Sequence, residues 1–202
     1  NIMKRTFFSL ALLLAVATLT AQTKMTAREA AVKIADRILA STTYEFKNTK
    51  TGEIYKSVKK LPLDMDVKVA CKYNNWHYTN GVTNMALMEL GDKLGDKKYE
   101  KYVLKNMNFV FNEGNLDFFR KQYDEAFKRD GWNAVRKLSW HMIFRGKRLD
   151  DNGPMGASLI ELQLKYPNDS FLGYINETAE HLNYGEPRLV DGTIARIWPH
   201  VN

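Results

Sequence analysis

Apolar residues recur at three- and four-residue spacing along most of the chain, which is the pattern of amphipathic helices. The first run begins with Thr26-Ala27-Arg28-Glu29, a sequence typical of a capping box at a helix start. Between residues 80 and 94 the apolar positions cover more than one face, which predicts a helix packed on several sides. Further helices are predicted at 99–110, 116–127, 132–142, 154–166 and 171–182.

Strand signals are few. Residues 44–63 are rich in lysine and threonine and are predicted to form a surface connection, while residues 66–73 alternate only weakly. The predicted fold class is therefore all-α, built from antiparallel helical hairpins. Repeated hairpins suit an open solenoid or a closed toroid, and the absence of a fixed-period repeat signature favours a toroid of inner and outer helices.

The first residues have the three-part layout of a secretory signal peptide. Met3-Lys4-Arg5 is the charged start, residues 7–17 are mostly apolar, and residues 18–21 supply the small residues Thr18, Thr20 and Ala21. The apolar run is shorter than the roughly 20 residues that span a bilayer, which favours cleavage over a retained anchor. We therefore expect a signal peptide at 1–21, a mature domain at 22–202, and a periplasmic or secreted protein with no other membrane contact.

Composition narrows the function classes only partly. Apolar residues make up 45% of the 202 residues, enough for a substantial core. The formal charge is +7, and removing Lys4 and Arg5 with the signal leaves 7 − 2 = +5, which suits anionic ligands. No basic run is interleaved with aromatics, so a nucleic-acid partner is not expected. The single cysteine, Cys71, excludes an internal disulfide and is interpreted as a small buried residue.

The most informative polar segment is Arg148–Ala157, in which Asp150, Asp151 and Asn152 precede a Gly-Pro break. One interpretation is that Asp151 or Asn152 caps a helix that has Pro154 in its first turn. The other is that Asp151 binds a ligand, because a helix amino terminus favours the carboxylate form, which accepts hydrogen bonds from hydroxyl groups. Asp150 is then a second acceptor or faces water.

A second segment, residues 74–82, places aromatic and amide side chains just before a predicted helix. Trp76 and Tyr78 are able to stack on a sugar ring, and Asn80 is able to bond its hydroxyls. The alternative is that both aromatic residues belong to the core, with only a polar tip at the surface.

A third segment, residues 191–200, contains Arg196 and Trp198. Arg196 is able to form two parallel hydrogen bonds with one carboxylate, and Trp198 is able to stack on a ring. The histidines show no metal-ligand spacing, and no carboxylate or cysteine cluster supports zinc. Phosphate-loop, dinucleotide and nucleophile-elbow motifs are also absent.

Taken in order, the three segments resemble the unsaturated glucuronyl and rhamnogalacturonyl hydrolases of glycoside hydrolase families 88 and 105. The matching pieces are Trp76–Val82, Leu149–Gly156, and Asp191–Thr193 continuing through Arg196–Pro199. The resemblance runs from about Met25 to the end, with residues 112–147 longer than the family's minimal version. It implies a toroid of six α-hairpins that needs no metal or cofactor and acts on oligosaccharides with a 4,5-unsaturated uronic acid at the non-reducing end.

The resemblance also implies an unusual hydrolysis, in which the double bond is hydrated instead of the glycosidic bond being attacked between paired carboxylates. A protonated aspartate gives a proton to C4, water adds at C5, and the resulting hemiketal opens and releases the sugar. By position, Asp151 is similar to the aspartate that binds the sugar hydroxyls and supports the proton donor. Tyr78 is similar to an aromatic that lines the sugar site, and Arg196 stands where some relatives have a histidine.

The family's proton-donating aspartate is expected in a Trp-x-Asp segment shortly after Pro199, and the sequence ends at Asn202. We therefore expect the chain to be the amino-terminal part of a partial (α/α)6 toroid, truncated and inactive alone. The leading hypothesis is an unsaturated rhamnogalacturonyl hydrolase, with the leaving sugar and the oligomeric state left open. The alternatives are a non-catalytic helical sugar-binding or interaction module, and a toroidal enzyme of another linkage, such as an intact-sugar hydrolase or an epimerase.

Overall fold

The computed structural model describes residues 25–64, 66–138, 140–145 and 149–195, apart from the side chain of Asp151. The predicted signal peptide at 1–21 lies outside these residues, as do Arg196 and Trp198. The chain consists of two units, Asn1–Asp36 and Arg37–Asn202, and the features below are described within one unit or the other.

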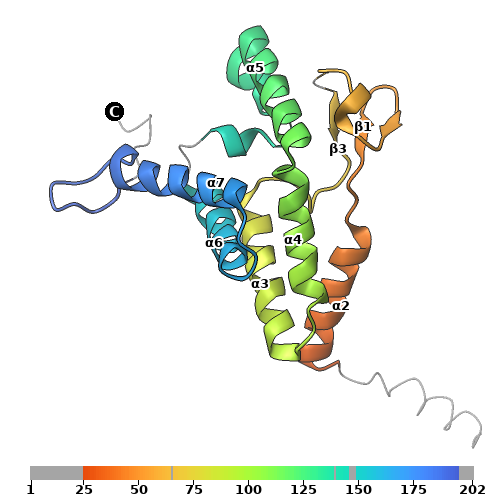
Figure 1. Cartoon of the computed structure of the whole chain (residues 1–202), viewed down its shortest axis with the longest axis vertical. Coiled ribbons are helices and arrows are strands. Elements are labelled where there is room, and N and C mark those ends of the chain that lie inside the picture. Colours follow the sequence, from red (N-terminus) through yellow and green to blue (C-terminus); the bar gives the residue numbers. More distant parts are fainter. Residues whose placement is uncertain (1–24, 65, 139, 146–148, 196–202) are drawn as a thin grey trace, which may run out of the picture. The chain divides into compact units, whose positions relative to one another are not determined.

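Helices dominate the described residues, as predicted (Figure 1). The first, α2 (Ala27–Ser41), begins with the expected capping box. The backbone N–H of Thr26 donates to the Glu29 carboxylate at 2.9 Å, and the backbone N–H of Glu29 donates to the Thr26 hydroxyl at 3.2 Å. None of the helices in the described ranges is long and apolar enough to cross a membrane.

A small antiparallel sheet has two strands in the segment predicted to be a surface connection and a third in residues 66–73, where the sequence alternates weakly. It has the order β2-β1-β3 and consists of β1 (Phe46–Asn48), β2 (Ile54–Tyr55) and β3 (Val67–Val69), with the short helix η1 (Val58–Lys60) between β2 and β3. The loop prediction was wrong because Phe46 is a core residue. Its ring is buried, with its centroid 5.7 to 6.0 Å from those of Phe109, Phe118 and Phe119.

The helices α3 (Tyr78–Leu94) and α4 (Lys98–Val110) form an antiparallel hairpin. Gly95 closes α3 in the left-handed conformation, with φ 66°, which glycine adopts without steric cost. At the other end of the hairpin, the Trp76 ring before α3 lies 6.2 Å from the Phe111 ring after α4.

Helix α5 (Glu113–Val135) follows α4 and contains a kink. Gly131 adopts φ 52° and ψ −136°, and Asp130 before it is also non-helical. The predicted helix at 132–142 was therefore wrong: α5 ends at Val135, and the next helical segment is the 3-10 turn η2 (His141–Phe144). The apolar spacing at 132–142 comes from a chain that folds back on itself, so that Val135 and Leu138 pack with Ala126 before the kink.

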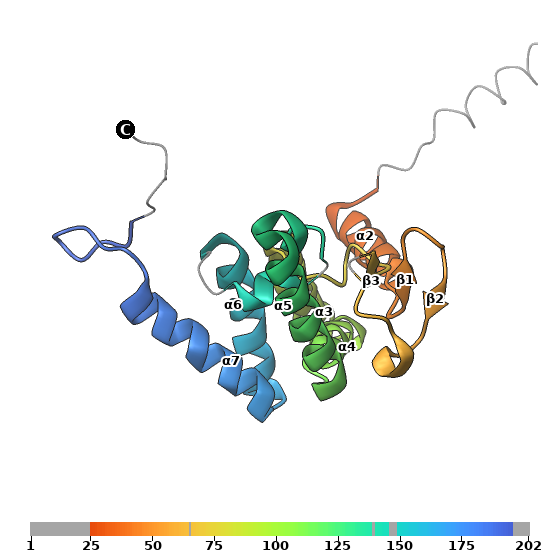
Figure 2. The same cartoon turned by 90° about the horizontal axis from the view of Figure 1, so that it is seen from above.

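Helix α6 (Leu149–Lys165) starts five residues before Pro154, so the prediction that this proline lies in the first turn was wrong. Pro154 packs directly against Gly81 of α3. Helix α7 (Asp169–Glu180) then turns back across α6 and ends in a π-helical turn, η3 (His181–Gly185). Figure 2 shows α6 and α7 diverging from their short connection.

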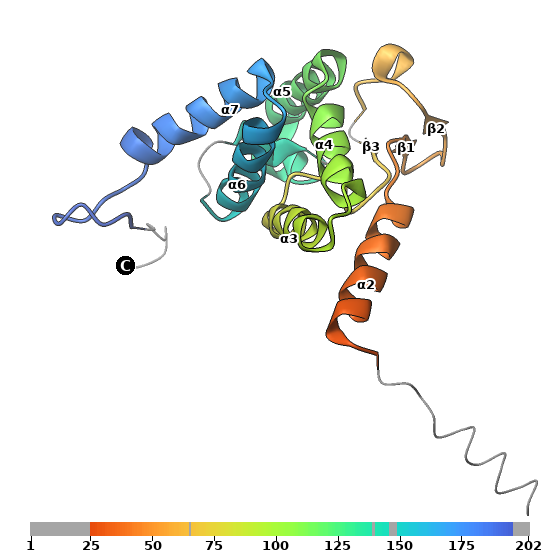
Figure 3. The same ribbon diagram turned by 60° about the horizontal axis from the view of Figure 1, so that its bottom comes forward.

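The most extensive helix contact joins α3 and α6, which are far apart in the sequence (Figure 3). Gly81 near the start of α3 touches Pro154 near the start of α6. At the other end, the Lys165 ammonium of α6 lies 3.2 Å from the Asp92 carboxylate of α3. The two helices therefore run parallel, with their amino-terminal ends side by side.

The carboxyl-terminal ends of α3 and α6 are tied together by an ionic cluster. Glu100 of α4 is only 7% exposed and accepts hydrogen bonds from the Lys165 ammonium, at 2.6 Å, and from the Tyr166 hydroxyl. These two donors, Lys165 first, hold the pKa of the Glu100 carboxyl below its ordinary value. The cluster links three helices at the end opposite Tyr78 and Asp150.

Candidate functional site

Two of the three polar segments meet at the amino-terminal ends of α3 and α6. The Trp76 Nε1–H donates a hydrogen bond to the Asn152 side-chain oxygen at 3.1 Å, across a separation of 76 residues in sequence. The backbones also touch: a Cβ placed on Gly81 would lie 2.5 Å from the Met155 nitrogen and 2.7 Å from the Pro154 Cβ. The resemblance to carbohydrate hydrolases thus involves two segments that form one local structure.

Trp76 is the core of this junction. Its side chain is completely buried, and its ring centroid lies 4.9 Å from that of Tyr174 in an edge-to-face arrangement. The rings of Phe111 and Trp140 lie within 6.4 Å of it. Trp76 therefore has the core role that the sequence left open, and no face of its ring is open to a sugar in this structure.

Tyr78 is the first residue of α3 and remains 47% exposed. Its ring lies 4.6 Å from the ring of His77, which caps the helix by accepting a hydrogen bond from the backbone N–H of Thr79 at 3.3 Å. The capping role of His77 was not predicted, since histidine is not among the usual N-cap residues. The result is an exposed aromatic pair at the start of α3.

The Asn80 side chain was predicted to bond sugar hydroxyls, but in the structure it is buried and bonds the protein backbone. Its side chain is 8% exposed, and its amide nitrogen donates to the backbone carbonyls of Lys72 and Asn75 at 3.0 and 2.9 Å. These hydrogen bonds fix the loop that leads into α3. Asn80 thus positions the segment that carries Tyr78, and both its amide hydrogens are used within the protein.

Asp150 and Asp151 lie in the first turn of α6, as its second and third residues. The helix starts at Leu149, so neither Asp151 nor Asn152 is its N-cap, and the capping interpretation was wrong. Asp150 is exposed. The backbone N–H groups and the dipole of a first helical turn attract negative charge, so both aspartates stand at a position that suits a carboxylate.

Asn152 instead links α6 to two aromatic residues. Its buried side-chain oxygen accepts hydrogen bonds from the Trp76 indole and from the Tyr174 hydroxyl, both at 3.1 Å. Burial raises the pKa of Tyr174 above its ordinary value, and its hydroxyl is the donor in the bond to Asn152. Tyr174 was predicted only as part of an apolar stripe, because nothing in local sequence connects it to Asn152.

The described part of the third segment, Asp191–Ala195, forms an exposed turn of its own. The Asp191 carboxylate accepts a hydrogen bond from the backbone N–H of Thr193, which lowers the pKa of that carboxyl. Arg188 donates to the carbonyls of Gly192 and Leu182, which anchors the turn to the end of α7. The predicted binding residues of this segment, Arg196 and Trp198, lie outside the described residues.

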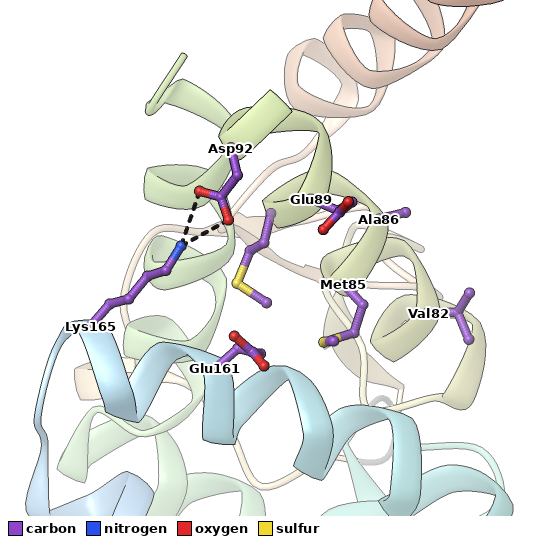
Figure 4. Close-up of a pocket in the computed structure, with 8 residues that line it drawn as sticks. Val82, Met85, Ala86, Glu89, Asp92, Glu161 and Lys165 are labelled. Atoms are coloured by element: carbon purple, nitrogen blue, oxygen red, sulfur yellow. Dashed lines mark hydrogen bonds and ion pairs between the residues drawn. The ribbon is translucent and has the colours of Figure 1, made fainter. Parts of the chain in front are cut away.

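A groove of about 460 Å³ runs along the seam between α3 and α6 (Figure 4). Its apolar lining comes from Val82, Met85, Ala86 and Met88, and its polar lining is three carboxylates, Glu89, Asp92 and Glu161, with the single ammonium of Lys165. This charge balance disfavours an anionic sugar. Within the described part of the chain, no group of three or more His, Cys, Asp or Glu side chains is placed to hold a metal ion.

Comparison with known proteins adds no relative: no model of a protein family matches the chain, and no curated protein matches it. The candidate site therefore depends on the sequence segments and on their geometry. It consists of the exposed Tyr78 at the start of α3 and of Asp150 and Asp151 in the first turn of α6, two helix ends that the Trp76–Asn152 hydrogen bond joins.

Proposed function

We propose that this chain carries the sugar-binding side of a glycoside hydrolase that removes a 4,5-unsaturated uronic acid from the non-reducing end of an oligosaccharide, most simply one derived from rhamnogalacturonan. One observation supports this function above the others. The two segments that resemble the hydrolases, distant in sequence, lie against each other through the Trp76–Asn152 hydrogen bond and the Gly81–Pro154 contact.

The chemistry of the paired helix ends suits the hydroxyl groups of a sugar. Two helix amino termini side by side concentrate unpaired N–H groups and partial positive charge, which stabilise anions. A carboxyl group in the first turn of a helix is favoured in its ionised form, which accepts hydrogen bonds from sugar hydroxyls, and we assign this role to Asp151. Tyr78 offers an exposed ring for stacking on the sugar. The proton for C4 then comes from a second aspartate, which the resemblance expects after Pro199.

We also propose that α3 and α6 are neighbouring inner helices of a six-hairpin toroid. Their parallel direction and close packing support this arrangement, because inner helices of such a toroid all run the same way. The antiparallel α4, which follows α3 through a three-residue connection, then belongs to the outer layer. In this arrangement the amino-terminal ends of the inner helices share one side of the ring, where Tyr78 and Asp151 lie.

The test uses the purified full-length protein that carries this sequence. It is incubated with unsaturated disaccharides from pectin or glycosaminoglycans, and loss of the absorbance of the conjugated double bond is followed. Turnover is expected, and Asp151→Asn is expected to lower kcat about 10- to 100-fold, because a hydrogen bond to a charged group contributes about 1.5–3 kcal/mol. Asp169→Asn, an exposed aspartate in the first turn of α7, is the matched control and should leave kcat unchanged.

No decay with any of these disaccharides would refute the proposed activity. An unchanged rate in Asp151→Asn would limit that residue to a structural role at the start of α6. If the sugars bind without turnover, the protein is instead a non-catalytic carbohydrate-binding module, the main alternative from another class.

A further inference from the structure

Helix α3 has an apolar face that its two main neighbours, α4 and α6, leave open. Four side chains of this face line the groove between α3 and α6 at the i, i+3, i+4 and i+7 spacing of one helix side: Val82, Met85, Ala86 and Glu89 (Figure 4). Val82 is 56% exposed, and Ala86 is exposed as well. In the described part of the chain this face is therefore uncovered, although the sequence predicts a helix packed on several sides.

Helix α6 presents a face of the same kind on the other side of the groove. Four of its side chains have the same spacing, and each is at least partly exposed: Ala157, Ile160, Glu161 and Leu164. Glu161 lines the groove, and Leu164, one turn further along the same side of α6, is 76% exposed. Exposed apolar faces that adjoin in this way often mark a place where another protein binds.

The dimensions of the groove suit a helix. Its lining extends along α3 from Val82 to Asp92, a separation of 92 − 82 = 10 residues, which is about 15 Å at the rise of an α-helix. An amphipathic helix of about three turns has this length, and it binds by laying its own apolar side chains into such a groove. The parallel walls formed by α3 and α6 therefore fit a third helix.

Carboxylates dominate the charged lining of the groove. Glu89, Asp92 and Glu161 line it, against the single ammonium of Lys165, which already pairs with Asp92 and with a buried glutamate of α4. Glu89 pairs with Lys93 at a position where both are exposed, an arrangement that contributes little and exchanges readily. Glu161 has no ion pair with any described residue. The chain as a whole carries a charge of +7, so this groove is negative against the general balance.

These carboxylates also stand near the helix ends at which negative charge is least favourable. Asp92 lies in the last turn of α3, and Glu161 lies four residues before the end of α6. The free carbonyl groups of a last helical turn carry partial negative charge, which favours a cation and disfavours a carboxylate. Because α3 and α6 run parallel, two such ends lie side by side. A positively charged side chain bound in the groove would relieve this repulsion.

We propose that the groove between α3 and α6 binds an amphipathic helix of another protein, which carries lysine or arginine beside its apolar face. The apolar side chains of that helix pack on Met85 and Leu164, and its basic side chains pair with Glu89 and Glu161. A second copy of this chain is a poorer occupant, because a symmetric contact would bring the same carboxylates together. The proposal goes beyond the proposed function and does not depend on it.

The experiment measures binding of a fluorescent model peptide to the purified full-length protein that carries this sequence. The peptide contains only leucine and lysine, with leucine at i, i+3, i+4 and i+7, and its binding is followed by fluorescence anisotropy. Saturable binding that weakens as the salt concentration rises is expected, because salt screens exposed charges. A second peptide has glutamate in place of every lysine and the same apolar face, and it should not bind detectably.

Two variants of the groove have matched controls on α7. Ala86→Arg fills the groove with a large, positively charged side chain and is expected to weaken binding by about tenfold or more, because it combines steric exclusion with like-charge repulsion. Ala179→Arg makes the same change at another exposed helical alanine. Glu161→Gln removes one carboxylate and is expected to weaken binding about threefold, within the range of an exposed ion pair. Glu180→Gln removes an exposed carboxylate from α7. Both controls should bind like the wild type.

Equal binding by wild type, Ala86→Arg and Glu161→Gln would overturn the proposal, and so would equal binding of the glutamate peptide. Absence of binding would overturn it as well, and the variants then identify the occupant. If the wild type is a dimer by sedimentation and Ala86→Arg is a monomer, a second copy occupies the groove. If both are monomers and Ala86→Arg is less stable than Ala179→Arg, the protein's own chain covers it. Turnover of unsaturated disaccharides is measured separately, so none of these results decides the proposed function.

Discussion

Gly81→Ala is expected to destabilise the protein, although the same change usually stabilises a helix. Alanine has a helix propensity about 1 kcal/mol better than that of glycine. Gly81, however, lies where α3 meets α6, and the new methyl group would stand 2.5 Å from the Met155 nitrogen and 2.7 Å from the Pro154 Cβ.

The size of the effect follows from what must move. Reaching an ordinary contact of 3.4 Å requires a shift of about 3.4 − 2.5 = 0.9 Å between the methyl group and the Met155 nitrogen. Backbone atoms of α6 cannot rotate away as a side chain does, so the steric cost lies at or above the upper end of the roughly 1–3 kcal/mol usual for overpacking. After subtracting about 1 kcal/mol of helix propensity, we expect a net loss of about 2 kcal/mol.

Urea unfolding followed by far-UV circular dichroism measures this loss. The matched control is Gly173→Ala in α7, where a Cβ would have no neighbour within 4 Å and alanine is expected to stabilise by up to about 1 kcal/mol. The near-ultraviolet spectrum should also change in Gly81→Ala, because Trp76 lies at the same junction. If Gly81→Ala is as stable as the wild type or more so, the close parallel packing of α3 on α6 is refuted.

Three further predictions concern the polar contacts that hold the same helices. Asn152→Ala leaves the buried Trp76 N–H and a tyrosine O–H without an acceptor and should cost about 2–4 kcal/mol in urea unfolding; a loss below about 1 kcal/mol would contradict the hydrogen-bonding role of Asn152. Lys165→Met leaves the buried Glu100 carboxylate without its ammonium partner and should cost about 1–3 kcal/mol. The control Lys93→Met breaks an exposed pair and should change stability by no more than about 0.5 kcal/mol. Equal losses in the two variants would show that burial of the ion pair does not matter here. The pKa of Glu100 in the folded protein lies below its ordinary value of 4.5, so its stabilising effect is present above pH 4.5 and is lost as the pH falls through the folded pKa. The difference in stability between wild type and Glu100→Gln should therefore shrink below pH 4.5. A difference that stays constant in acid would refute the assignment.

Local sequence predicts those elements whose signals lie within one or two helical turns. The capping box at Thr26 and the apolar spacing of α3, α4 and α7 belong to this kind, and the structure confirms these helices to within a few residues. The mistakes share a physical cause, which is a tertiary contact that overrides the local signal. Phe46 forms a strand residue because an aromatic cluster from α4 and α5 covers it, although its neighbours are polar.

The candidate site shows the same division. Clustering of aromatic and amide residues before α3 predicted a binding segment, and in the structure Tyr78 is exposed at its end whereas Trp76 is buried. The cluster did not show which aromatic residue is buried, because Trp76 and Tyr78 are two residues apart and only the position of α6 decides between them. Similarly, asparagine is a residue type that is common at N-caps, but Asn152 accepts hydrogen bonds from two aromatic residues that are distant in sequence.

The structure divides the matching segments into packing residues and residues available for chemistry. Gly81 and Pro154 let the two backbones meet, and Trp76 and Asn152 join them by a buried hydrogen bond. A binding module that had lost catalysis would need these four residues just as much as an enzyme does. The matching segments therefore favour the parallel junction of α3 and α6 more strongly than they favour hydrolysis. The two functions differ in turnover, so hydrolysis of the unsaturated disaccharides by the wild type is the decisive experiment, and the comparison of Asp151→Asn with Asp169→Asn then measures what the start of α6 contributes to it.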